Sequence, residues 1–425
     1  MYERLGIDKD IAALAQRAEQ ELCERFCALD ALAEENQARV LQAFWENRVC
    51  EAHFAGSTGY GYNDRGRDTL DAVYASVFGA EDALVRHQFT GGTHALTVAL
   101  FGVMRPGQTL LSVTGSPYDT LLEVIGLRGK PGMGSLMEFG VNYREMALTP
   151  DGGIDTGSAL AQLDDHTVGA VFIQRSRGYR ARRALSVAEI EAFCRAVKKR
   201  RPDVAVIVDN CYGEFAEDRE PCAVGADLAV GSLIKNPGGG LTDTGAYIAG
   251  RRKWVERCAY RLTSPGIGRE VGATLNQSRN MFRGLFLAPT VTASALKTAL
   301  LASALFQKLG YEVSPRPDEP RFDIIQTVEL KSREALLAFC KGIQAGAPVD
   351  SFFTPEPCAM PGYEDEVIMA SGSFVQGSSI ELSADAPLCE PYRVFLQGGL
   401  TYPAGKAGVL LAAQELRRAG LLPKD

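Results

Sequence analysis

The spacing of hydrophobic and polar positions along this 425-residue chain changes several times. Between residues 9 and 48, apolar side chains recur at steps of three and four with charges between them, which predicts helix. From residue 68 to about 290, helical periodicity alternates with short uninterrupted apolar runs. Such runs are typical of strands buried on both faces. The alternation therefore predicts a mostly parallel sheet covered by helices on both sides.

Individual elements can be placed from the same pattern. Helices are expected at 68–78 and at 187–200, the second beginning with a capping box of Ser186 and Glu189. Strands are expected at 109–113, 168–173, 204–208 and 227–230. The last third predicts a smaller α+β domain, with helices at 293–308, 333–344 and 405–418 and strands near 322–330 and 378–383. We therefore expect three parts, which are a helical arm over 1–60, a large domain over 61–292 and a small C-terminal domain over 293–425.

Composition and charge narrow the classes of function. The chain is 46% hydrophobic and 23% charged, as in ordinary soluble proteins. Its formal net charge of −7 argues against a nucleic-acid binder, which needs a basic surface. The first ten residues carry acids where a signal peptide needs an apolar run, and Lys297 interrupts the most apolar stretch, 290–306. We expect a cytoplasmic protein that binds neither nucleic acid nor membrane.

The ten cysteines and four histidines raise the question of metal or redox chemistry. No pair of cysteines has the CxxC spacing, and the histidines form no HExxH motif. The cysteines are scattered through a long chain, unlike those of a small disulfide scaffold. We therefore expect reduced thiols that pack as small hydrophobic residues, and no metal site.

Two features of the alternating region are candidates for ligand binding. The segment 90–95, Thr-Gly-Gly-Thr-His-Ala, is a glycine-rich turn opening into a helix, which can offer N–H groups to an anion such as phosphate. The alternative is a plain turn between two elements. The apolar run that begins at Ala205 ends in Asp209, and a carboxylate at the end of a buried strand can hold a cation or a protonated ring nitrogen. The alternative is a helix cap or a loop acid.

A lysine supplies the third feature. Lys235 follows the apolar run that ends at Ile234 and precedes the glycine triplet 238–240. We expect its amine to be partly desolvated, with a lowered pKa, and so able to form a Schiff base. Ser232, three residues earlier, can bind a phosphate. Together with Asp209, these parts match pyridoxal phosphate, which needs a lysine, an acid for its pyridinium nitrogen and donors for its phosphate.

At this point the chain resembles the fold type I pyridoxal-phosphate enzymes, and most closely the methionine gamma-lyase-like family, also called the aluminium resistance proteins. The segments that carry the resemblance keep the family order, and they are HFAGSTGYGY at 53–62, GSPYDT at 115–120, QRSRGY at 174–179, VDN at 208–210, GSLIKNPGGG at 231–240 and QGGLTY at 397–402. The resemblance implies a PLP-dependent transferase-like fold with a mostly parallel seven-stranded sheet. It also implies Lys235 as the Schiff-base lysine, Asp209 as the partner of the pyridine nitrogen, and Gly92, Thr93 and Ser232 as the residues that hold the phosphate.

The resemblance extends to assembly and to the substrate. It implies a homotetramer built as a dimer of dimers, with the site at the dimer interface and with Tyr60 or Tyr62 reaching the phosphate of a neighbouring subunit. Tyr118 is our candidate to stack on the cofactor ring and to donate a proton, and packing in the core is the alternative. In the arginine-rich segment after the strand at 168–173, Arg175 and Arg177 are candidates to bind a substrate carboxylate.

The implied reaction is elimination from the β or γ carbon of an amino acid, as in a carbon–sulfur lyase, with release of a 2-oxo acid and ammonia. Lys235 would remove the Cα proton. Nothing in the sequence fixes the leaving group, so a halide or another γ-substituent is an alternative to sulfur. Two further alternatives are an aminotransferase or aldolase that uses the same cofactor, and a non-catalytic protein that has kept the fold.

Overall fold

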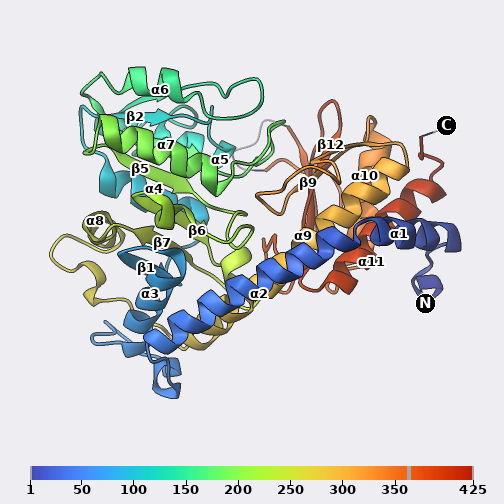
Figure 1. Cartoon of the computed structure of the whole chain (residues 1–425), viewed down its shortest axis with the longest axis horizontal. Coiled ribbons are helices and arrows are strands. Elements are labelled where there is room, and N and C mark those ends of the chain that lie inside the picture. The colour runs from blue at the N-terminus through green and yellow to red at the C-terminus, as the bar shows by residue number, and fades with distance from the viewer. Residues whose placement is uncertain (1, 361–364, 424–425) are drawn as a thin grey trace. The chain divides into compact units, whose positions relative to one another are not determined.

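The computed structural model describes residues 2–360 and 365–423, and the chain divides into two compact units. The large unit comprises residues 37–286, and the small unit combines residues 1–36 with residues 287–425. Two long helices, α2 (Cys23–Glu46) and α9 (Ser278–Lys308), contribute residues to both units (Figure 1). The expected domain boundaries after residues 60 and 292 stay a prediction.

The large unit is built on a seven-stranded sheet with the order β1-β7-β6-β5-β4-β2-β3. Strands β2 to β6 run parallel to their neighbours among themselves, and β7 is antiparallel to both β1 and β6. The strands are β1 (Asp82–Arg86), β2 (Thr109–Ser112), β3 (Asn142–Glu145), β4 (Val168–Gln174), β5 (Ala205–Asp209), β6 (Leu228–Ser232) and β7 (Ala246–Gly250). The predicted α/β fold with a mostly parallel sheet is therefore confirmed.

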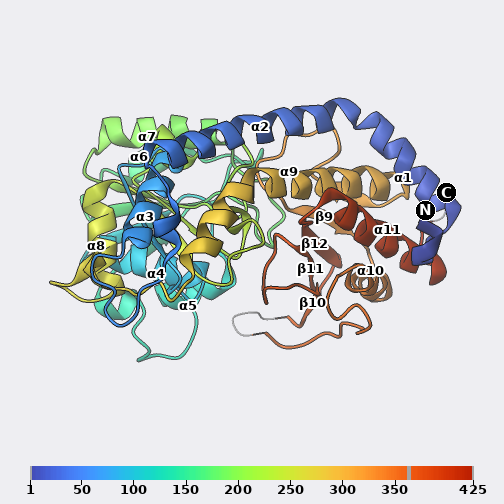
Figure 2. The ribbon, with the colours of Figure 1, turned by 90° about the horizontal axis from the view of Figure 1, so that it is seen from below.

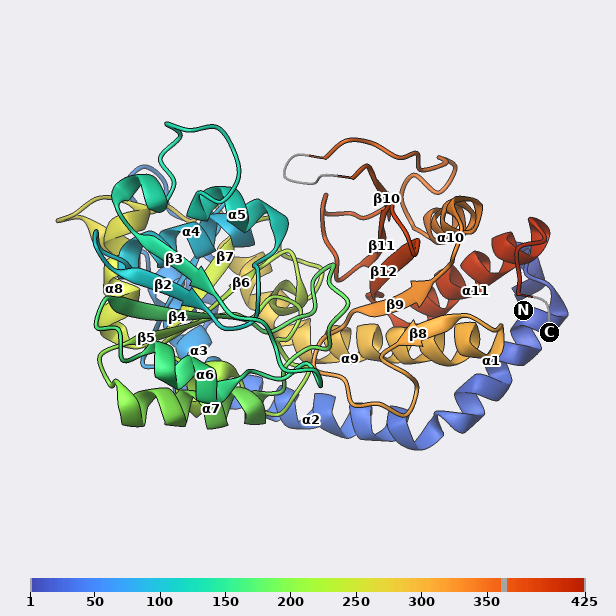
Figure 3. The same ribbon diagram turned by 90° about the horizontal axis from the view of Figure 1, so that it is seen from above.

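Helices cover both faces of this sheet (Figure 3). Successive strand residues point to opposite faces, so Phe172 and Ile207 pack towards one set of helices and Val171 and Val206 towards the other. The first set is α4 (Gly92–Val103), α5 (Asp119–Ile125) and α8 (Arg252–Leu262), and the second is α6 (Thr156–Gln162) and α7 (Val187–Arg200). Burial on both faces explains why these strands are continuously apolar. A further helix, α3 (Arg65–Phe78), packs beside β1.

The small unit contains a five-stranded antiparallel sheet with the order β10-β11-β12-β9-β8. Its elements are η1 (Tyr2–Leu5), α1 (Lys9–Glu21), β8 (Glu312–Ser314), β9 (Gln326–Glu329), α10 (Arg333–Ala345), β10 (Val367–Ser371), β11 (Leu382–Pro387), β12 (Arg393–Gly398) and α11 (Tyr402–Arg418). Helix α10 packs on β10 and β11 (Figure 2), and α1 lies beside α11 (Figure 1). The predicted α+β character of the C-terminal part is confirmed.

Most of the elements that were predicted lie within a few residues of the observed ones, whereas the strands β1, β3, β7, β8, β10 and β12 were not predicted. Helix α7 has the predicted bounds, and Ser186 and Glu189 form the expected capping box at its start. The predicted helix over 9–48 is wrong in extent, because it consists of α1 and α2, which are separated at Leu22. The predicted helix over 293–308 is the second half of α9, which continues through Pro289 although proline removes a hydrogen bond of the helix.

Helix α9 also bears on the question of membranes. By length and composition it is the one helix in the described part of the chain that is apolar enough to cross a bilayer. However, 72% of its most apolar 18-residue window is buried within the protein. A buried apolar helix of this kind is typical of the core of a folded domain.

Candidate active site

The carboxyl ends of β5 and β6 bring the predicted cofactor residues into one region of the large unit. The two strands are parallel neighbours, with Asp209 paired opposite Val230. Asp209 is the last residue of β5 and Ser232 the last of β6, and Lys235 follows three residues later. In open α/β sheets, ligands bind at the carboxyl ends of the strands, so the topology places all three residues where a ligand is expected.

Lys235 lies at the start of a short 3-10 turn, η5 (Asn236–Gly238), with its Nζ atom 3.8 Å from the centroid of the Tyr212 ring. Burial alone lowers the pKa of Lys235, but Cys211, Tyr212 and Asp209 surround the amine and hold its net pKa well above the ordinary value. The predicted lowering of this pKa is therefore wrong for the protein without cofactor. The reason is that the turn after β5 places several proton-accepting groups around the amine.

Asp209 is buried, and only 3% of its surface is exposed. Its Oδ1 atom accepts a hydrogen bond of 3.1 Å from the backbone N–H of Cys211, and it forms no ion pair with any residue that the structure describes. Burial raises the pKa of Asp209, and the nearby Lys235 opposes this shift. A buried carboxylate without an ion pair is costly, so this group suits a ligand that carries a positively charged nitrogen.

A small cradle lies between the start of α4 and the end of β6. A Cβ atom built on Gly92 would lie 3.4 Å from Cys211 Sγ and 3.4 Å from Ser232 Cβ, so the first residue of α4 faces both. The Oγ atom of Ser232 is buried and has no hydrogen-bond partner within the described residues. A buried hydroxyl opposite the N-terminus of a helix fits an anionic group such as a phosphate.

Tyr118 is tied to this cradle through Thr93. Its hydroxyl donates a hydrogen bond of 2.9 Å to Thr93 Oγ1, and its backbone N–H donates one of 3.0 Å to Gln174 Oε1. Burial raises the pKa of Tyr118, and the negative charge of Asp209 raises it further, so the phenol keeps its proton. The predicted stacking of Tyr118 on a cofactor ring stays a prediction.

The two predicted substrate arginines are both buried. Arg175 is completely buried, and its guanidinium donates to Glu217 Oε2 at 2.7 Å and to Asn210 Oδ1 at 2.7 Å. Both contacts are with side chains of the large unit, so Arg175 stabilises the interior of this unit and does not make the predicted contact with a substrate. Arg177 is 2% exposed and stays a candidate for the substrate carboxylate.

Tyr60 and Tyr62 lie on the surface of the large unit. They are 69% and 62% exposed, and their ring centroids are 5.4 Å apart. The loop is anchored by Arg67, whose Nη1 atom donates a hydrogen bond of 2.8 Å to the carbonyl of Gly61. The structure therefore leaves these two rings available, and their contact with a neighbouring subunit stays a prediction.

Tyr212, which contacts Lys235, is not among the site residues predicted from the sequence. Its φ angle of +72° lies in the left-handed region, which residues other than glycine rarely adopt. Such backbone conformations persist where the surrounding structure fixes them, and they occur often at functional sites. The available signal was an aromatic residue three positions after an acid that ends a buried strand.

Comparison with known proteins assigns the chain to a family. The family model described as methionine gamma-lyase matches residues 11–417. This chain belongs to the methionine gamma-lyase family. The family resemblance inferred from the motifs is thus confirmed, and membership supports lyase activity.

Several known proteins are similar to this member of the methionine gamma-lyase family over most of its length. The Bacillus subtilis protein YnbB is 48% identical over 422 residues, which cover 99% of this chain and 100% of that protein. A carbon-sulfur lyase involved in aluminium resistance from Clostridium novyi has 50% identity and a TM-score of 0.94, with 97% of each chain covered. The pyridoxal-5'-phosphate dependent protein YhfS from Escherichia coli shares the fold alone, with 17% identity, a TM-score of 0.63 and coverage of 91% of this chain and 96% of that one.

Proposed function

We propose that this member of the methionine gamma-lyase family is a pyridoxal-phosphate-dependent carbon–sulfur lyase that acts on an amino acid. The observation that carries the proposal is the arrangement of Lys235, the buried carboxylate of Asp209 and the unpartnered hydroxyl of Ser232 at the carboxyl ends of two neighbouring strands. An amine, an acid and a phosphate donor are what this cofactor requires.

The residues present fit the cofactor group by group. Asp209 would hold the ring nitrogen, Lys235 the aldehyde, and Ser232 together with Gly92 and Thr93 the phosphate. When bound, pyridoxal phosphate withdraws electrons from the substrate Cα and so makes its proton acidic.

Lys235 then moves protons at the substrate. In the free protein its raised pKa keeps the amine protonated, with the charge of Asp209 among the causes. Once Asp209 is paired with a cationic nitrogen, its charge no longer holds the proton of the lysine. The Nζ atom can then accept the Cα proton, and a γ-elimination needs a second proton removed from Cβ.

Tyr118 supplies the acid in this scheme. Its phenol is protonated and held in place by Thr93, so it can donate a proton to the departing group. A sulfur leaving group would depart as a thiol, and the remaining products would be a 2-oxo acid and ammonia.

The proposal includes a second copy of the chain and a cytoplasmic location. The exposed rings of Tyr60 and Tyr62 would complete the site of a neighbouring subunit in a dimer of dimers. Light scattering of the purified protein would give the mass of the assembly. All ten cysteines are free thiols, which agrees with a reducing compartment.

An amino-acid screen tests the proposed function. We expect the purified protein with pyridoxal phosphate to release ammonia and a 2-oxo acid from a sulfur-containing amino acid, and expect Lys235→Ala to release neither. Lys199→Ala is the matched control, because Lys199 is exposed on α7 and should leave the activity unchanged. Release from a halogenated amino acid alone would reassign the leaving group, whereas a requirement for a 2-oxo acid without ammonia release would indicate an aminotransferase.

A further inference from the structure

A buried carboxylic acid lies close to the site and takes no part in the proposed reaction. Glu214 is completely buried in the turn after β5. The hydroxyl of Tyr247, on β7, donates a hydrogen bond of 3.0 Å to its Oε1 atom. The Oε2 atom is buried without a hydrogen-bond partner in the described parts of the chain. An unpartnered buried carboxyl oxygen needs a physical explanation.

Glu214 is connected to both halves of the site. The side-chain amide of Asn236, next to Lys235, donates a hydrogen bond of 2.9 Å to the backbone carbonyl of Glu214. Asn210, next to Asp209, donates to the oxygen of Tyr247 at 3.1 Å. A Cβ atom on Gly231 of β6 would lie 2.2 Å from Glu214 Oε1, so the absence of a side chain at position 231 makes room for the acid.

The charges around Glu214 leave it without a counter-ion. Glu217 is paired with Arg175 at 2.7 Å. Glu220 lies 3.6 Å from Arg175 and 3.7 Å from Arg39. No lysine or arginine of the described residues is within ion-pair distance of Glu214. Ionising this acid would add an uncompensated charge to a dry interior, which favours the protonated form.

We propose that Glu214 is a positioning residue for Lys235: it stays protonated in its buried pocket, withholds a second negative charge from the lysine, and thereby lets the amine lose its proton and react with an aldehyde. The inference rests on the proposed function, because it concerns the residue that would bind the cofactor. It assigns no direct contact between Glu214 and the substrate.

The electrostatics agree with this geometry. The pKa of Glu214 is raised to about 8, chiefly by burial and also by the charge of Glu220, although a backbone hydrogen bond, Tyr247 and Lys235 oppose the shift. The titratable groups that face Glu214 are Tyr74, Cys211, Glu220, Lys235 and Tyr247. Below about pH 8 the acid is therefore neutral, and above it the new negative charge strengthens the hold on the proton of Lys235.

The first test follows the capture of pyridoxal phosphate by the protein without cofactor. The Lys235 amine and the aldehyde condense with loss of one water, and the rate is read from the change in visible absorption between about pH 6 and about pH 10. In the wild type, we expect the rate to rise with pH and the rise to weaken above about pH 8. Glu214→Gln, which imitates the protonated acid, should lose this inflection and exceed the wild type at high pH by about tenfold.

Two controls make the comparison specific. Titration of pyridoxal phosphate itself is common to all variants and cancels in their ratio. Glu191→Gln removes a carboxylate from α7 in the same unit, outside the site, and should follow the wild-type profile. Superimposable profiles for Glu214→Gln and the wild type would overturn the proposal.

If Glu214→Gln does not fold, a second variant and a second measurement still test the proposal. Tyr247→Phe removes the hydrogen bond that favours the ionised acid, so the inflection should move to higher pH, and an inflection that stays or falls would contradict the proposal. Infrared spectra of the wild type near pH 6 should show the carbonyl band of a buried protonated carboxyl, and this band should shift to higher frequency in Tyr247→Phe, because the carboxyl oxygen loses its hydrogen bond. A wild type that shows this band but never captures the cofactor would refute the proposed function instead.

Discussion

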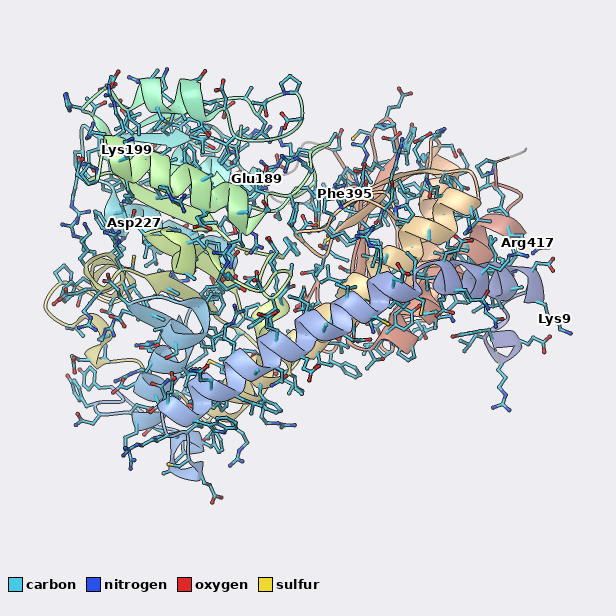
Figure 4. The ribbon with its side chains drawn as sticks, viewed as in Figure 1. Lys9, Glu189, Lys199, Asp227, Phe395 and Arg417 are labelled. Carbon is cyan, nitrogen blue, oxygen red and sulfur yellow. The ribbon has the colours of Figure 1, made fainter. Side chains whose placement is uncertain are left out.

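Two buried aspartates, which lie at opposite ends of neighbouring strands, differ in the charged partners that surround them. Asp227, just before β6, forms ion pairs with Lys198 and Arg251 and accepts a hydrogen bond of 2.7 Å from the backbone N–H of Val206. Figure 4 labels Asp227 together with two residues of α7, which are Glu189 near its start and Lys199 in its last turn, next to Lys198 in the sequence. Asp209, at the end of β5, has a backbone hydrogen bond and no described ion pair.

This difference in charged partners indicates that, within one sheet, one buried aspartate contributes to stability and the other to ligand binding. A buried carboxylate whose charges are matched by the protein holds elements together. A buried carboxylate left unmatched raises the free energy of the empty protein, and it recovers that free energy only when a suitable cation binds. We therefore expect the two aspartates to respond oppositely to the same substitution, which removes the charge and keeps the shape.

Asp209→Asn should give the largest effect on activity. The amide cannot hold a cationic nitrogen, so we expect elimination activity to fall by roughly 10²- to 10⁴-fold. The free energy of unfolding of the cofactor-free protein should change by less than about 1 kcal/mol, because the relief from burying the carboxylate is offset by the loss of its attraction to Lys235. Steady-state kinetics and urea denaturation measure the two quantities. A large loss of stability with normal activity would break the comparison.

Asp227→Asn should show the reverse behaviour. Loss of the buried charge leaves Lys198 and Arg251 without their partner, so we expect the free energy of unfolding to fall by roughly 2–4 kcal/mol. The estimate lies towards the low side because both cations are partly exposed and regain water. Activity per folded molecule should stay unchanged, and urea denaturation with kinetics at low temperature checks both.

Ser232→Ala tests the same distinction between stability and binding at the carboxyl end of β6, the strand that begins after Asp227. Its hydroxyl has no described partner, so its removal should leave the stability of the cofactor-free protein unchanged or slightly higher. One hydrogen bond to a charged phosphate is worth about 1.5–3 kcal/mol, so the dissociation constant of pyridoxal phosphate should rise roughly 10- to 150-fold. Fluorescence titration measures this constant, and an unchanged value would remove Ser232 from the phosphate site.

The pH dependence of stability should also differ between the wild type and Glu214→Gln. The pKa of Glu214 is raised from 4.5 to about 8, so the folded protein binds more protons than the unfolded chain within that window. Stability contributed by this group is therefore present at low pH and falls as pH rises from about 4.5 to 8, by at most about 1.4 kcal/mol per pH unit. Glu214→Gln should lack this fall, and urea denaturation at several pH values would detect it.

The sequence was informative where one local pattern fixed one residue. Lys235 and Asp209 could be found because each lies at or shortly after the carboxyl end of a buried strand, and parallel strands bring such ends together. Arg175 was misassigned because its partners, Glu217 and Glu220, lie more than forty residues later, where no spacing rule connects them. The direction of the pKa shift of Lys235 was missed for a similar reason, because it depends on the left-handed turn that holds Cys211 and Tyr212.

The small unit is made of two segments that lie far apart in the sequence, and this has a consequence for synthesis of the chain. Helix α1 buries Ile11, Ala15 and Ala18 in a core that includes Leu410 and Leu416 of α11. About 250 residues lie between the two parts of this unit. At roughly 5–20 residues per second, a ribosome needs roughly 12 to 50 seconds to translate them. The apolar face of α1 therefore leaves the ribosome long before its partners exist, and the large unit is complete before the small unit can close.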